Sequence, residues 1–182
     1  MREQDKMTDK IVTRERITAM CHINRWRGWT TRPYSVGEHV AIGANTMSWF
    51  NRPAEQIKRW WMHDMHETEV IGDVPTPDKR MYVNAAYDAA VEDFDMRLGA
   101  EMDLGDLWWR DKGVKDIDRK VLIVENELIA VRKDPALPEP EYSDPMVKDM
   151  VAYMGGKGVW ITPGSVIRLY NKHALMYGWE QI

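Results

Sequence analysis

The stretch from Trp60 to Asp73 constrains the fold more than any other part of the chain, because it sets a histidine beside an aspartate inside an apolar run. His63 and Asp64 each cost free energy if they are buried without a partner. Adjacent residues on a helix point about 100° apart, so these two side chains do not pair with each other. They can converge on a group that lies between them, and a metal ion is the first candidate.

The ligand types narrow the choice of ion. An imidazole nitrogen together with a carboxylate oxygen suits Mn, Fe, Co, Ni or Zn better than Ca, with Mg as a further option. We therefore expect a divalent transition metal as the cofactor.

Length and composition limit the class of protein. The 182 residues fit one domain with its own core. A formal net charge of -4 argues against a protein that binds polymeric nucleic acid. Cys21 is the one cysteine, so no internal disulfide can form, and no apolar run approaches the ~20 residues that span a bilayer. We expect a cytoplasmic protein that makes no contact with a membrane.

Helical periodicity, interrupted by proline and glycine, predicts the fold. No stretch alternates over the length of a strand, so we expect an all-α, compact bundle of six or seven helices. Ser35 has the position of an N-cap, with Glu38 at the capping-box spacing. The expected helices cover residues 6–20, 36–50, 54–71, 78–102, 114–133, 146–154 and 163–177.

Two further metal-type side chains lie on separate predicted helices, His39 before the pair and Asp118 after it. Taken alone, a helical histidine is usually a satisfied, partly buried residue, and a single aspartate usually lies at the surface. The order of all four, each on a predicted helix, is much harder to obtain by accident. We therefore predict that His39, His63, Asp64 and Asp118 bind one metal ion.

Five short motifs extend this pattern. They are Asn24–Trp26, Ser35–His39, His63–Glu67, Gly72–Pro77 and Lys115–Asp118. Together they resemble the HD-domain metal-dependent phosphohydrolases, and among these the small bacterial 5'-deoxynucleotidases and the phage dATP triphosphohydrolases. The resemblance covers about 23–130 of a single domain over 1–182, and it leaves a C-terminal helical extension of about 143–182.

The resemblance implies a role for each matching residue. Glu67 would be the general acid or base, and its place four residues after His63 would put it on the same helical face. Asp73 would position substrate or water. An extra residue between Glu67 and Gly72 leaves Glu69 as a rival for the acid/base role, and His66 stands where the family has a small residue.

The resemblance also implies a substrate. Arg25 and Lys79 would hold phosphate, and Trp26 would pack against the sugar and disfavour a 2'-hydroxyl. The preferred expectation is a dNTP triphosphohydrolase of the dATP type. The alternatives are a 5'-deoxynucleotidase acting on dNMP and a catalytically silent, nucleotide-binding sensor domain.

Two further expectations concern the setting of the protein. If a phage encodes the chain, the compartment would be the host cytoplasm. A homo-oligomer is also expected, with Trp108, Trp109, Trp160 and Trp179 as interface candidates, although packing in the core explains these aromatic residues equally well.

Overall fold

The computed structural model describes residues 10–70, 72–74, 85–156 and 161–182. Over these residues the chain is a bundle of seven α-helices without a β-strand, which confirms the all-α prediction. The α-helices are α1 (Arg14–Met20), α2 (Val36–Trp49), α3 (Ala54–Met62), α5 (Ala85–Met102), α6 (Lys112–Leu128), α7 (Pro145–Gly155) and α8 (Pro163–Tyr177). Short 3-10 helices lie between them: η1 (Arg25–Gly28), η2 (Met65–Thr68) and η3 (Trp108–Arg110).

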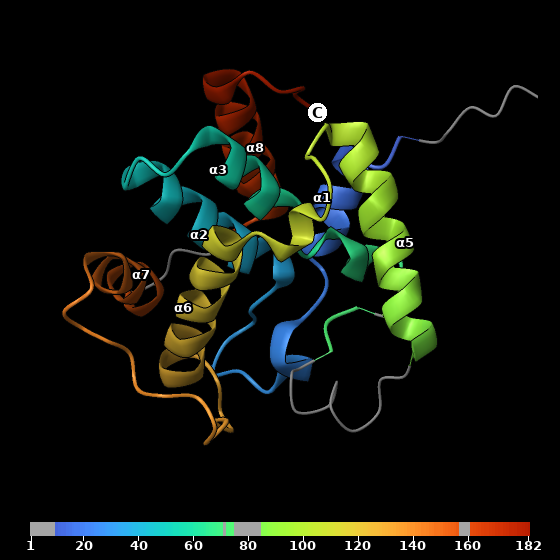
Figure 1. Ribbon diagram of the computed structural model, residues 1–182. Helices are drawn as coiled ribbons and strands as arrows, with labels where there is room; N and C mark the ends of the chain where they lie inside the picture. Colours follow the sequence, from blue (N-terminus) through green and yellow to red (C-terminus); the bar gives the residue numbers. More distant parts are fainter. Residues whose placement is uncertain (1–9, 71, 75–84, 157–160) are drawn as a thin grey trace, which may run out of the picture.

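Helix α2 is the central element, with α1, α3, α6, α7 and α8 packed around it (Figure 1). Most of its residues are buried, as expected for a helix that is enclosed on all sides. Ser35 is its N-cap, as predicted, and the Ser35 Oγ accepts a hydrogen bond from the Glu38 backbone N–H at 3.1 Å. Gly43 allows the close approach of α3, because a Cβ there would lie 2.1 Å from the Trp60 ring.

The predicted third helix, 54–71, is wrong beyond Met62. His63 caps the end of α3, and Asp64 leaves helical geometry with φ -109° and ψ 11°. The chain then forms η2 and reaches Gly72, whose φ of 76° ends the segment. The two adjacent metal-type residues therefore lie in a turn, where their side chains are free of the fixed 100° offset of a helix.

The first predicted helix, 6–20, begins later than expected. Helix α1 starts at Arg14, because the Thr13 side chain accepts the Arg16 backbone N–H at 3.2 Å and caps the first turn. Thr8, which could cap a helix over 6–20, lies outside the described residues.

Two other predicted helices differ at their ends. Helix α5 is described from Ala85, and 78–84 lie outside the described residues. Periodicity puts Ala86 and Ala90 on one face with Phe94 and Leu98, but the structure buries only the last two of these four. Helix α6 starts two residues earlier than predicted and stops at Leu128 rather than at 133. It stops there because the Ile129 carbonyl accepts the Thr31 backbone N–H at 2.8 Å. Helices α7 and α8 lie within one residue of their predicted bounds.

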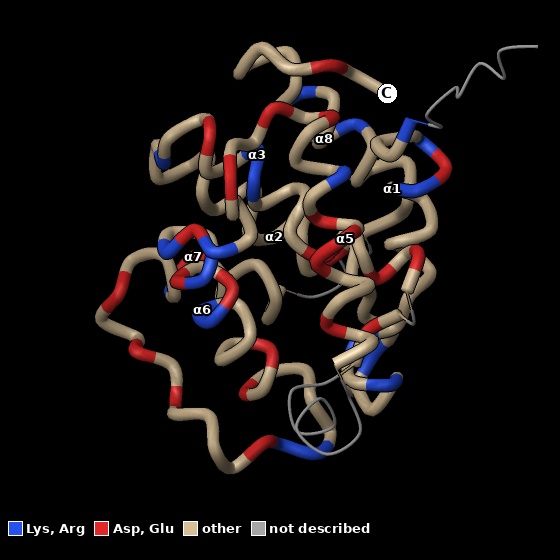
Figure 2. Tube along the Cα trace, turned by 45° about the vertical axis from the view of Figure 1, so that its right-hand side comes forward, with Lys and Arg blue, Asp and Glu red and all other residues tan. Residues whose placement is uncertain are grey.

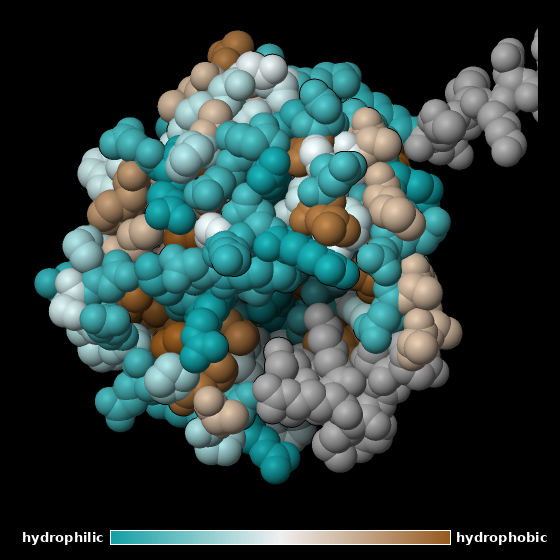
Figure 3. Space-filling model, in the orientation of Figure 1, coloured by the Kyte–Doolittle hydropathy of each residue, from teal (hydrophilic) through white to brown (hydrophobic). Residues whose placement is uncertain are grey.

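Charged, polar and hydrophobic residues all lie on the surface of the described part. Figure 2 shows acidic positions along the connector between α6 and α7, and Figure 3 shows hydrophobic side chains in separate patches on a mainly hydrophilic face.

The tryptophans named as interface candidates differ in exposure. Trp108 is buried in the core, and Trp109 and Trp179 are half-buried; Trp160 lies outside the described residues. Among the described helices, none has the length and apolar character that crossing a bilayer requires.

Candidate metal centre

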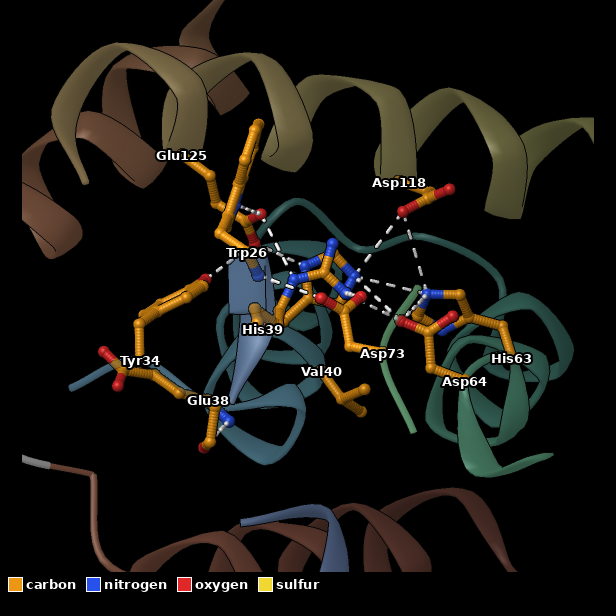
Figure 4. A network of polar contacts seen from close by, with 12 residues as sticks. Trp26, Tyr34, Glu38, His39, Val40, His63, Asp64, Asp73, Asp118 and Glu125 are labelled. Carbon is orange, nitrogen blue, oxygen red and sulfur yellow. Dashed lines mark hydrogen bonds and ion pairs between the residues drawn. The ribbon is translucent and has the colours of Figure 1, made fainter. Parts of the chain in front are cut away.

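Side chains from three separate parts of the chain meet beside α2 (Figure 4). His39 comes from α2, His63 from the end of α3 and Asp118 from α6. Their ligand atoms all lie within 4.8 Å of one another, so this group could hold a metal ion. Asp64 adds a carboxylate, because its Oδ2 lies 3.2 Å from the His63 Nε2 and 3.5 Å from the His39 Nε2.

Hydrogen bonds determine which nitrogen of each imidazole faces this group. The His63 Nδ1 lies 2.7 Å from the Trp60 carbonyl oxygen, which can only accept, so this nitrogen carries a proton. The His39 Nδ1 lies 2.6 Å from the Glu125 Oε1, and a carboxylate also accepts. In their neutral forms both rings therefore turn an Nε2 lone pair toward the site, and the two Nε2 atoms are 3.3 Å apart.

The result is a cluster of acceptor atoms that attracts positive charge. The Asp118 Oδ1 lies 3.5 Å from the His39 Nε2 and 3.8 Å from the His63 Nε2. Burial and Arg25 act to lower the pKa of His39, but Glu125 and Asp118 outweigh them and raise it to about 9. Two imidazoles and two carboxylates are a suitable donor set for a divalent transition metal, so the residues fit the expected cofactor.

The two aspartates of the cluster remain ionised. Burial opposes this, but the neighbouring His63, His39 and Arg25 hold the pKa of Asp64 well below its ordinary value. Burial is likewise outweighed at Asp118, where His39 and His63 lower the pKa. The Asp118 side chain is 32% exposed, so it marks the side on which the cluster opens to solvent.

Arg25, predicted as a phosphate ligand, lies inside the same network. Its Nη1 is 3.2 Å from the Asp64 Oδ2 and 3.9 Å from the Asp73 Oδ1, and its Nε is 3.3 Å from the Glu125 Oε2. Burial opposes the charge, yet these carboxylates raise the pKa of Arg25 well above its ordinary value. The guanidinium is thus a fixed cation beside the candidate ligands.

The predictions from sequence missed Glu125, the most deeply embedded carboxylate of the site. It is fully buried and accepts hydrogen bonds from the Tyr34 hydroxyl at 2.8 Å and the Trp26 Nε1 at 3.2 Å, besides its contact with His39. Burial opposes its ionisation, but Arg25 and His39 lower its pKa. A carboxylate that holds the outer nitrogen of a ligand histidine fixes the orientation of the ring. The available signal was its place seven residues after Asp118, two turns further along α6.

Trp26 and Asp73 form one structural unit. Trp26 has a positive φ of 54°, and its backbone N–H donates to the Asp73 Oδ2 at 2.9 Å. Burial raises the pKa of Asp73; Arg25 acts in the opposite direction, while Asp64 and Glu125 raise it further. Asp73 therefore holds the left-handed turn of η1 against the site.

The two rival glutamates have different surroundings. Glu67 is buried in η2, three residues beyond Asp64. We predicted that it would share one continuous helix with His63, and this is wrong, because α3 ends at Met62. Glu69 lies further out, where its carboxylate binds Arg16 at 2.8 Å and Arg97 at 2.9 Å. Lys79 lies outside the described residues.

Tyr87 of α5 is a second neighbour that we did not predict. Burial, followed by the carboxylates of Glu67, Asp64 and Asp73, raises its pKa to about 12. The carboxylates of the site thus influence Tyr87, and α5 packs against η2, which carries Glu67.

Comparison with known proteins adds no relative: no family model, curated protein or solved structure matches this chain. The chemistry of the site is therefore inferred from its own residues.

Proposed function

We propose that the chain is a divalent-metal-dependent phosphohydrolase of the HD type that acts on deoxyribonucleotides. The observation that supports this most is the convergence of His39, His63 and Asp118, from three elements far apart in sequence, with Asp64 beside them. A structural helical bundle has no need for such a cluster of acceptors, which is costly to bury without a cation.

The ligands present favour Mn, Fe, Co, Ni or Zn, with Mg as a further option. A divalent ion held by these residues would supply Lewis-acid polarisation of a phosphoryl oxygen and would lower the pKa of a water molecule. Glu125 keeps the His39 ring turned toward the ion, and the Trp60 carbonyl does the same for His63.

The remaining residues have roles in binding the substrate and moving protons. Arg25 supplies the cation and the planar donor group that recognise a phosphate oxygen. Glu67, buried three residues after Asp64, exchanges a proton with the attacking water or the leaving oxygen. Asp73 positions that water or the substrate, and Trp26 faces the sugar.

Charge favours a monophosphate over the triphosphate that we preferred from the sequence. In the described part of the site, Arg25 already contacts three carboxylates, those of Asp64, Asp73 and Glu125. A triphosphate carries more negative charge than a monoester and requires further cations. Lys79 and Arg80, the nearby candidates in sequence, lie outside the described residues. The 5'-deoxynucleotidase reaction, dNMP to deoxynucleoside and phosphate, is therefore a second candidate with its own support.

The test is a panel of dNMPs and dNTPs with Mn or Co, and chromatography of the products separates phosphate from triphosphate release. Asp64→Ala and Asp118→Asn should abolish turnover. Asp116→Asn is the matched control, since Asp116 lies on the exposed side of the same helix and pairs with Lys120. Activity of wild-type level in Asp64→Ala would refute the proposal, and tight nucleotide binding without turnover would instead support the sensor alternative.

A further inference from the structure

His66 and Asp95 form a buried polar pair that the proposed mechanism does not use. The His66 Nδ1, in η2, faces the Asp95 Oδ1, in α5, across 3.7 Å. The two residues are 7% and 3% exposed, and neither of these atoms has a hydrogen-bond partner among the described residues. Buried polar side chains in folded proteins nearly always have a partner, so this pair needs an explanation.

The position of His66 in the chain suggests an explanation for this pair. His66 directly precedes Glu67, and its carbonyl oxygen accepts the backbone N–H groups of Glu69 and Val70 at 3.0 Å each. The Glu67 backbone N–H in turn donates to the Asp64 carbonyl at 3.1 Å. A movement of His66 is therefore passed on to its chain neighbour Glu67 through the backbone of η2.

Met65 anchors η2 in the hydrophobic core, and α1 also packs against it. The ion pairs beside η2 lie toward the surface. Glu69 holds Arg16 and Arg97, and the Glu69 and Arg97 side chains are 39% and 48% exposed, so solvent weakens these ion pairs. His66 and Asp95 are the buried polar contact between η2 and α5, and α5 packs against η2. Helix α5 is thus placed to influence η2, the segment that carries Glu67.

We propose that His66 and Asp95 are a positioning pair, in which the His66 N–H donates to the Asp95 carboxylate and sets Glu67 against the metal site. This proposal rests on the phosphohydrolase function given above. A direct hydrogen bond forms when the two atoms approach by under about 1 Å, and catalytic contacts often tighten in this way once substrate is bound. Among the described residues, no hydrogen bond or ion pair joins either side chain to the candidate metal ligands, so the pair acts on the rate through η2.

The experiment is a double-mutant cycle of His66→Ala and Asp95→Ala, read as kcat, KM and Mn affinity with the substrate that the wild type turns over. Each single change should lower kcat by about 10- to 100-fold, with KM and Mn affinity changed by less than about threefold, because a catalytic group is displaced while the ligands stay in place. The double variant should be no slower than the worse single variant, because both changes remove the same interaction.

Asp95→Asn keeps an acceptor at the same place and should recover most of kcat. It also covers the case in which Asp95→Ala does not fold. Glu92→Ala is the control, since Glu92 is an exposed carboxylate one turn earlier on α5. Normal kcat in Asp95→Ala, or effects of the two single changes that simply multiply, would overturn the proposal. Where Asp64→Ala is inactive and Asp95→Ala is normal, only the pair fails; where Asp64→Ala is active, the proposed function itself fails.

Discussion

Glu125 gives the sharpest test of how the site is held together. Its Oε1 accepts from His39 and Tyr34, and its Oε2 accepts from Trp26 and Arg25. Glu125→Gln has nearly the same shape, but its amide can accept through one oxygen only. If that oxygen stays with His39, the amide N–H₂ faces two donors in a buried site.

The size of the effect follows from these contacts. Each buried donor that loses its acceptor costs about 1–3 kcal/mol. Arg25 keeps its contacts with Asp64 and Asp73, so the loss there is smaller, and we expect a total of about 2–4 kcal/mol in the free energy of unfolding. Weaker orientation of the His39 ring should also lower metal affinity by about 10- to 100-fold.

Urea unfolding and a Co titration measure the two effects separately. Glu127→Gln is the matched control, because Glu127 lies half a turn further on α6 and pairs with Lys133 near the surface, where ion pairs contribute about 0–1 kcal/mol. A Glu125→Gln protein as stable as wild type, with the same affinity for Co, would refute the role assigned to Glu125.

Three other predictions concern single sites. Burial, with Lys172, lowers the pKa of His173 from 6.5 to about 4, so below pH 6.5 the unfolded chain takes up a proton that the folded chain does not. The free energy of unfolding should therefore fall by about 3 kcal/mol between pH 6.5 and pH 4. In His173→Gln, unfolding curves measured over this pH range should show a smaller fall. Gly43→Ala should lower the melting temperature and weaken metal binding, because the new Cβ meets the Trp60 ring that stacks on His63; calorimetry with unchanged melting would contradict this. Burial, with Glu38, raises the pKa of the Cys21 thiol from 9.0 to about 11, so less of the thiolate is present at neutral pH. Alkylation should therefore run about 100-fold slower than for an ordinary cysteine. An ordinary alkylation rate would contradict the burial of this thiol.

The fold class could be predicted because its signals are local. Periodic apolar positions, prolines, glycines and the cap at Ser35 each act within a few residues, and α2, α7 and α8 lie within a residue or so of the predicted bounds. The ends of α3 and α6 could not be predicted in this way. The apolar pattern continues past Met62, and the end of α6 depends on a hydrogen bond from Thr31, almost one hundred residues earlier in the chain.

In the candidate site, too, the residues with a local signal could be predicted, and those that depend on distant contacts could not. The metal-type side chains could be named because a histidine beside an aspartate is unusual inside an apolar run and the order of the four residues is hard to obtain by accident. The structure brings His39, His63 and Asp118 together. Glu125 was missed because a glutamate on a helix usually faces solvent, and its burial follows from partners on three other segments. The left-handed turn at Trp26 depends on Asp73, a residue far along the chain that no local pattern connects with it.

The central claim is that two imidazoles and two carboxylates bind a single divalent ion. An anomalous difference map from crystals grown with Mn tests it most directly. We predict one peak per chain, bonded to the Nε2 atoms of His39 and His63 and to carboxylate oxygens of Asp64 and Asp118. A map without a peak at this place, or with Mn bound by other residues while Asp118 points away, would contradict the claim.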